Sequence, residues 1–291
     1  MMRPRWPVAN LRSANVLVAA VLVIAAAGLA IGALLFVRRR APEGSYFADG
    51  DRASGFFGVI ATGFAVLLGL VVVLAFTSYD ESRAGAETEA LTLAQQYEVA
   101  HLLPPAGGRR LAAELVCYGR SVVHLEWPRM QQGTQTDAMN PWGIALFRTL
   151  RTIDPQSAPE QTAYAKWLDQ RLDREAARGA RIHGAAGVIP TPLWLVLFLI
   201  AILIVGFMMF FADRGERPLV QAALIGTVVA TMTAILLVIG FLDNPYRKGL
   251  GSLQPVAMQR TLQLLEQERL IVGDSTPMPC DAHGRPRTTR G

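Results

Sequence analysis

Long apolar stretches alternate with charged segments along this chain, and four of the apolar stretches contain no Asp, Glu, Lys or Arg. They cover residues 15–37, 55–77, 191–212 and 219–242. About 20 apolar residues, at a rise of 1.5 Å per residue in a helix, cross the roughly 30 Å hydrocarbon layer of a bilayer. The pattern therefore predicts an integral membrane protein with four transmembrane helices in contact with the lipid bilayer.

The first apolar stretch is longer than the apolar part of a cleavable signal peptide. Basic residues precede it, but it runs over 23 residues and is followed at once by Arg38, Arg39 and Arg40. A cleavable signal has an apolar region of about 7–15 residues. We therefore expect this stretch to be retained as the first transmembrane helix.

The polar stretch between the second and third spans, residues 78–190, has helical spacing throughout. No Pro occurs from residue 78 to 103, which predicts that the second span continues beyond the membrane as one long helix. A helix is also expected at 109–127, ended by Pro128, and another at 140–153. No alternating β pattern competes with this interpretation.

A capping signal marks the helix that leads back to the third span. Ser157 is followed three residues later by Glu160, which is the pattern of a capping box, and we expect this helix to run up to Gly184. Its expected buried stripe consists of Tyr164, Trp167 or Leu168, and Leu172. Four arginines share one face, for which we predict a solvated surface, with attraction of anions or binding of anionic lipid heads as alternatives: Arg171, Arg174, Arg178 and Arg181.

These elements make an all-α fold, with a helical cytosolic domain (78–190) inserted between the second and third spans. The rest consists of an N-terminal tail (1–14), loops such as 38–54, and a C-terminal tail (243–291) with one helix and a partly disordered end. Four spans place both tails and the central domain on one side. Near the membrane that side carries ten Lys and Arg against six on the other, which favours the cytoplasmic side of the inner (plasma) membrane.

Composition excludes several classes of protein. The chain is 52% hydrophobic and 18% charged, as in a membrane protein, and its net charge of +5 lies outside the spans. No basic patch is interleaved with aromatic residues, so we expect no nucleic acid partner. Cys117 and Cys280 are far apart and have no partner motif, so they do not predict a disulfide framework and fit a reducing compartment.

Enzymatic chemistry has no support in the sequence. The four histidines, at positions 101, 124, 183 and 283, lack the spacing of metal ligands. Phosphate-binding loops, nucleophile elbows and His-Glu-x-x-His motifs are also absent from the sequence. We therefore predict no catalytic residues, no cofactor and no metal site.

An ordered set of short motifs resembles the bestrophin-like membrane proteins of bacteria, a family distantly similar to the bestrophin anion channels. The motifs are YGRSVVHLEW at residues 118–127, IPTPLW at 189–194 and LDNPYRKGL at 242–250, and they follow the second span with its helical extension. The resemblance covers residues 55–264. The positions that we match to the family pattern are Glu89, Glu126, Trp127, Asn244, Pro245 and Tyr246.

The resemblance implies a homo-oligomer, pentameric by analogy, that conducts small inorganic anions along its second span. The pore-facing stripe would then consist of Thr62, Val66, Leu70, Val73 and Thr77. Ordinary helix packing is the alternative, because Gly63 and Gly69 lie beside these residues. No run of acidic residues follows the last span, so the calcium gating of animal bestrophins is not implied.

Two functions of different classes remain open at this stage. The first is an oligomeric anion-permeable channel. The second is a membrane-anchored structural or signalling module whose cytosolic helical domain binds a partner. Gly28 and Gly32 in the first span form a Gly-x-x-x-Gly motif, which permits either oligomerisation or packing against another span of the same chain.

Overall fold

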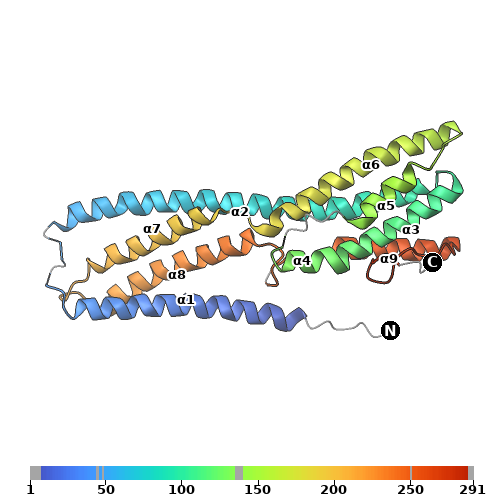
Figure 1. Ribbon diagram of the computed structural model, residues 1–291. Helices are drawn as coiled ribbons and strands as arrows, with labels where there is room; N and C mark the ends of the chain where they lie inside the picture. The colour runs from blue at the N-terminus through green and yellow to red at the C-terminus, as the bar shows by residue number, and fades with distance from the viewer. Residues whose placement is uncertain (1–7, 44–45, 48, 135–139, 250, 288–291) are drawn as a thin grey trace. The chain divides into compact units, whose positions relative to one another are not determined.

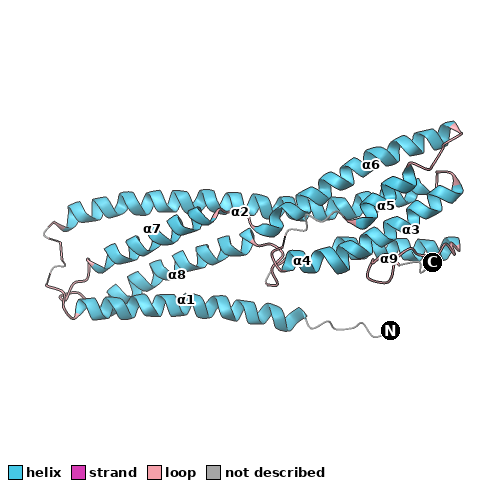
Figure 2. Ribbon diagram, viewed as in Figure 1, coloured by secondary structure: helices cyan, strands magenta, loops and turns pink. Residues whose placement is uncertain are grey.

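The structure is a computed structural model that describes residues 8–43, 46–47, 49–134, 140–249 and 251–287. Over these ranges the chain is helical, and its β structure is one isolated bridge between Cys280 and Pro286 (Figure 2). Four helices are long and apolar enough to cross a membrane, which confirms the predicted fold class. The chain divides into two compact units: the first comprises residues 1–77, 188–243 and 249–251, and the second comprises 78–187, 244–248 and 252–291.

The first unit consists of four long apolar helices that lie lengthwise beside one another (Figure 1). They are α1 (Val8–Arg38), the N-terminal part of α2 (Gly50–Ala100), α7 (Thr191–Met209) and α8 (Pro218–Asp243). Ala30 and Leu34 of α1 pack in one cluster with Ile225 and Val229 of α8. The unit is therefore held together by close contacts between apolar side chains.

The glycine motif of α1 takes no part in that packing. A Cβ built on Gly28 or Gly32 would meet nothing within 4 Å, so neither glycine lies against another span in the described chain. Of the two alternatives for this motif, packing within the chain is wrong for the described residues, because Ala30 and Leu34 face α8 instead.

A second apolar cluster joins α2 to α7 and α8. Phe64, Leu68 and Val71 of α2 pack there with Leu197 of α7 and Ile239 of α8. The turn before α7 is fixed by a carboxylate at the end of α8, because Asp243 Oδ1 accepts the backbone N–H of Val188 and of Ile189 at 2.7 and 2.8 Å. Two otherwise unpaired donors near a helix start are thereby satisfied.

Helix α2 is continuous over 51 residues, from Gly50 to Ala100. At 1.5 Å per residue its length is about 75 Å, more than twice the thickness of a bilayer's hydrocarbon layer. This confirms the prediction that the second span continues as one helix, which follows from the absence of Pro until Pro104.

The second unit contains the remaining helices around an apolar core. They are α3 (Pro105–Ser121), a π-helical turn (Val122–Glu126), α4 (Trp127–Gln131), α5 (Pro141–Leu150), α6 (Ala158–His183), a 3₁₀ turn (Gly184–Ala186) and α9 (Val256–Val272). The predicted capping box of α6 is confirmed, with the Ser157 and Glu160 side chains each bonded to the other residue's backbone N–H. Trp167 of α6 is fully buried, as expected.

Two details of this unit differ from the sequence-based expectation. Pro128 does not end the helix at Trp127, because it lies in the first turn of α4, where a missing N–H costs little. Leu172 is not part of the buried stripe of α6 and is 63% exposed. Arg174, two residues further on, is buried although it was expected on a solvated face.

A disulfide joins Cys117 of α3 to Cys280, and both residues are fully buried. The expectation that the two cysteines stay unpaired is wrong, because folding brings together residues 163 positions apart. The segment around Cys280 also accepts two hydrogen bonds from two helices. Arg120 of α3 donates to the Asp281 carbonyl, and Trp142 Nε1 of α5 donates to the Gly284 carbonyl. The segment that contains Cys280 therefore contacts both α3 and α5; residues 288–291 lie outside the described chain.

Candidate functional site

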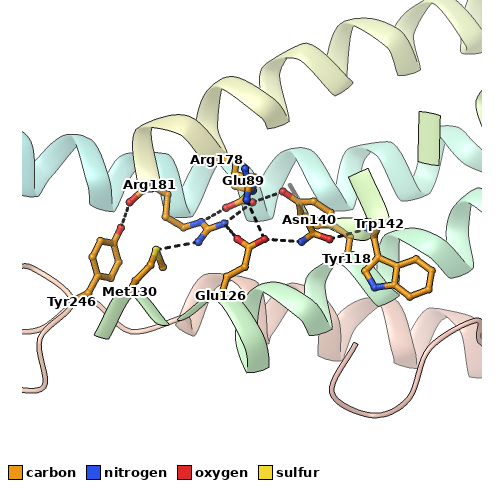
Figure 3. Close-up of polar contacts among 9 residues, drawn as sticks. All are labelled: Glu89, Tyr118, Glu126, Met130, Asn140, Trp142, Arg178, Arg181 and Tyr246. Atoms are coloured by element: carbon orange, nitrogen blue, oxygen red, sulfur yellow. Dashed lines mark hydrogen bonds and ion pairs between the residues drawn. The ribbon is translucent and has the colours of Figure 1, made fainter. Parts of the chain in front are cut away.

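A buried ion-pair cluster centred on Arg181 lies inside the second unit (Figure 3). The Arg181 guanidinium donates from Nε and Nη2 to the two oxygens of Glu89, and from Nη2 to Glu126 Oε2 at 2.6 Å. Arg181 and Glu89 are fully buried, and Glu126 is 5% exposed. One arginine therefore bonds to two carboxylates away from water.

Three parts of the fold position these groups. Glu89 lies on α2, Glu126 ends the π-helical turn, and Arg181 lies in the last turn of α6. Gly85 on α2 permits the close approach of α6, because a Cβ at this position would lie 2.7 Å from the Arg181 backbone nitrogen. Since π-helical turns are rare and concentrate at functional sites, this turn marks Glu126 as a specifically placed side chain.

Neutral side chains complete the hydrogen bonding of the cluster. Tyr118 donates its hydroxyl to Glu89 Oε1 at 2.6 Å, and Asn140 donates Nδ2 to Glu126 Oε1 at 2.8 Å. Tyr246 donates its hydroxyl to the Arg181 carbonyl at 2.5 Å. Arg178 adds a second cation, 3.4 Å from Glu126. The carboxylates therefore have the partners that a buried charge requires.

The electrostatics keep the ions of the cluster charged. Burial alone would lower the pKa of Arg181, but the charges of Glu89 and Glu126 outweigh burial, and its pKa is raised. Burial would raise the pKa of Glu126, but the charges of Arg181 and Arg178 lower it below its usual value. Burial raises the pKa of Tyr118, which therefore stays a neutral donor. The cluster therefore joins helices through charged groups.

The residues matched to the family pattern gather in this unit. Trp127 stacks edge to face on Tyr246, with ring centroids 5.4 Å apart, and donates its Nε1 hydrogen to the Leu253 carbonyl at 3.2 Å. Pro245 is buried beside Tyr246, and the Asn244 carbonyl accepts the N–H of Arg247 at 3.2 Å. Glu89 and Glu126 share Arg181. Glu89, Glu126, Trp127 and Tyr246 thus meet around Arg181, although they come from distant parts of the sequence.

The predicted pore stripe lies on α2 in the first unit. All five of its residues are exposed in the single chain: Thr62, Val66, Leu70, Val73 and Thr77. At 100° per residue the stripe lies about half a turn from the face of α2 that packs through Phe64, Leu68, Val71 and Ala75. The Thr77 hydroxyl donates to the Val73 carbonyl at 2.9 Å within the helix.

The two glycines beside the stripe do not lie against another helix of the described chain. A Cβ on Gly63 or Gly69 would meet nothing within 4 Å. The alternative that this face packs against another helix of the same chain is therefore excluded for the described residues. The face is left for lipid or for another copy of the chain.

Over the described ranges no three or more His, Cys, Asp or Glu side chains gather closely enough to hold a metal ion. Cysteine thiolates are strong metal ligands, but Cys117 and Cys280 are bonded to each other in a disulfide.

A comparison with protein-family models identifies the family. The model described as a Bestrophin-like domain matches residues 24–258, which is most of the chain. The chain belongs to the bestrophin-like family. No match was found among curated protein sequences.

Solved structures share the fold of this bestrophin-like chain. A crystal structure of a bacterial bestrophin homologue from Klebsiella pneumoniae has 14% identity and a TM-score of 0.57, covering 90% of this chain and 100% of that one. Another variant of that homologue has 15% identity and a TM-score of 0.55, covering 77% and 88%. A structure described only as a membrane protein has 14% identity and a TM-score of 0.59, covering 84% and 97%. At such low identity these likenesses show the fold alone.

Sequence reasoning missed the central residue of the cluster. The arginines of α6 were expected to form a solvated face, and this expectation is wrong for Arg174 and Arg181, which are 1% and 0% exposed. Their spacing of seven residues, with Arg178 between them, places them on one face, and that face turns inward. The carboxylates that face them come from other helices, so no local pattern pairs the charges.

Proposed function

We propose that this bestrophin-like protein is a homo-oligomeric membrane channel for small inorganic anions, with Thr62, Val66, Leu70, Val73 and Thr77 lining the pore. The exposed position of this stripe, opposite the packed face of α2, carries the proposal. Membership of the bestrophin-like family supports it. Because one helix cannot enclose a pore, the channel requires several copies of the chain, and five is the number by analogy with bestrophins.

The chemistry of the stripe fits a narrow apolar constriction. Val66, Leu70 and Val73 form its middle, and a hydroxyl-bearing threonine lies at each end. Apolar constrictions control conduction by excluding water, so the width at these side chains would set the current. Fixed acidic charges, which would repel anions, are absent from the whole second span.

Purified protein in planar bilayers tests the channel. We expect an anion current that Val66→Ala and Leu70→Ala increase, because each substitution widens the constriction. Leu74→Ala is the matched control: Leu74 is 58% exposed, like Val66, but lies about a quarter turn away from the stripe. Silence of the wild type and of both stripe variants at every pH tested would contradict the proposal, and so would a monomer by mass photometry.

A membrane-anchored module is the second candidate. The second unit is compact and has its own core, so it could engage a partner protein without any pore. A stable oligomer that never conducts would favour this function. Membership of the bestrophin-like family also supports a role without catalysis, and we propose no catalytic residue and no cofactor.

We further propose that the protein lies in the inner membrane with both termini and the second unit in the cytoplasm. The excess of Lys and Arg near the membrane on that side, ten against six, supports this orientation. The disulfide between Cys117 and Cys280 argues for the opposite side, because disulfides persist mainly in oxidising compartments.

Labelling in intact cells decides the orientation. A cysteine introduced at the exposed position Leu172 of the second unit should stay unlabelled by a membrane-impermeant maleimide if this unit is cytoplasmic. Permeabilised cells serve as the positive control. Labelling in intact cells would place this unit outside and overturn the proposed orientation.

A further inference from the structure

A pocket of about 440 Å³ lies in the second unit, apart from the proposed pore stripe. One wall is formed by Gly143, Ile144 and Phe147 of α5, and the other by Arg171, Arg174 and Arg178 of α6. Its size is in the range of small-molecule sites, which are mostly apolar with a few convergent polar groups. Figure 1 shows α5 and α6 side by side.

Arg174 is the most unusual residue of the pocket. It is 1% exposed, yet its Nε has no hydrogen-bond partner among the described residues. The one hydrogen bond of its guanidinium runs from Nη1 to Gln96 Oε1 at 2.6 Å, and the guanidinium lies 4.7 Å from the centre of the Tyr118 ring. A buried cation whose only partners are an amide and a ring has unused binding capacity.

The carboxylates near Arg174 are bonded to other arginines. Arg181 binds Glu89 and Glu126, and Arg178 lies 3.4 Å from Glu126. Glu175 also lines the pocket but is paired with Arg171 at 2.9 Å. Arg174 is therefore a buried arginine that has no ion-pair partner within 4 Å in the described chain.

The apolar wall of the pocket indicates what else an anionic ligand of Arg174 would contain. Ile144 and Phe147 remain 38% and 39% exposed, and Arg171 lies over the Phe147 ring at 4.5 Å. An inorganic ion would leave this surface uncovered. A flat apolar body against α5, with its charge directed at Arg174, would cover it.

We propose that this pocket binds a small aromatic carboxylate, held by Arg174 and seated against Ile144 and Phe147. The carboxylate supplies the ion-pair partner that Arg174 lacks, and the ring covers the exposed apolar wall. This site does not depend on the proposed channel, because its binding can be measured on detergent-purified protein that carries no current.

Calorimetric titration of the full-length protein with sodium benzoate tests the proposal. We expect saturable binding of benzoate and none of benzyl alcohol, which has the ring without the charge, or of acetate, which has the charge without the ring. Arg174→Gln should weaken benzoate binding by about tenfold or more, the loss of one charged contact.

A second variant keeps the test valid if Arg174→Gln fails to fold. Gly143→Phe fills the pocket from α5, where a Cβ meets nothing within 4 Å, and should also abolish binding. Gly179→Phe is the matched control: this α6 glycine is equally open but does not line the pocket, so binding should persist. Absent benzoate binding, binding that Gly143→Phe leaves unchanged, or equal binding of acetate or benzyl alcohol would each overturn the proposal.

Discussion

The largest fully buried side chains lie in the second unit, whereas many large apolar side chains of the first unit are exposed. In the first unit Leu29, Ile24 and Ile202 are 76%, 70% and 68% exposed, whereas in the second Trp127, Trp167 and Leu115 are 2% exposed or less. Lipid is as apolar as these side chains, so helices in it associate by close packing without a hydrophobic driving force. A unit in water must bury the same side chains.

Charge is distributed in the opposite way. The spans of the first unit contain no ionisable residue, whereas the second unit buries Glu89, Glu126, Arg174 and Arg181. Buried charges are costly unless each has a partner, so they specify one arrangement of helices more strictly than apolar contacts do. The comparison teaches that the second unit depends on particular pairs and the first on general packing.

Removing the central arginine should have the largest effect. Arg181→Met leaves Glu89 and Glu126 buried without their cation, and breaking such a pair costs about 3–5 kcal/mol. Thermal unfolding of the detergent-purified protein measures the loss. Arg83→Met is the control, because Arg83 pairs with Glu87 on the surface of α2 and its loss should leave stability nearly unchanged. Equal effects of the two variants would contradict the importance of the buried cluster.

Loss of the disulfide should follow in size. Cys117→Ser frees the segment around Cys280 from α3, and removing a disulfide typically costs about 2–4 kcal/mol. Reduction of the wild type should lower the unfolding temperature in the same way, while the Cys117→Ser variant should not respond to reductant. A wild type that is insensitive to reductant would show that the bond does not form in the protein.

Two leucines on opposite faces of α2 test the first unit. Leu68 is 6% exposed and packs against α7 and α8, whereas Leu70 is 60% exposed. We expect Leu68→Ala to destabilise the protein by about 1–2 kcal/mol. This loss is smaller than in a water-soluble core, because in lipid the substitution removes packing contacts without losing a hydrophobic driving force. Leu70→Ala should leave the unfolding temperature of monomeric protein unchanged. An equal loss for both would mean that the exposed face of α2 is also packed.

Acid should produce the smallest effect and act on the second unit. The pKa of Glu126 is lowered below its usual value near 4.5 by Arg181 and Arg178, so its contribution to stability is present above that pH and is lost as the pH falls through the lowered pKa. The unfolding temperature should therefore be steady from pH 7 to about pH 5 and fall below about pH 4.5. Glu126→Gln should flatten this fall. A profile that the substitution does not change would assign the acid sensitivity to other groups.

Local patterns predict much of the fold because their causes are local. The four spans follow from apolar runs, the length of α2 from the absence of Pro before Pro104, and the start of α6 from the Ser157 and Glu160 capping box. The five residues of the pore stripe were found together by their helical spacing, although their role in a pore stays a prediction. The matched positions Glu89, Glu126, Trp127 and Tyr246 were also recognised, but without the contacts that unite them.

The sequence by itself determined which segments are apolar, where helices begin and how far α2 extends, since each depends on neighbours a few residues away. Only the tertiary structure decided that Arg174 and Arg181 turn inward, that Glu89 and Glu126 share one cation, and that Cys117 meets Cys280. Burial, ion pairing and disulfide formation join residues from distant parts of the chain. The way the helices pack decides which residues become partners. The periodicity of a single helix does not show which residues of another helix it will meet.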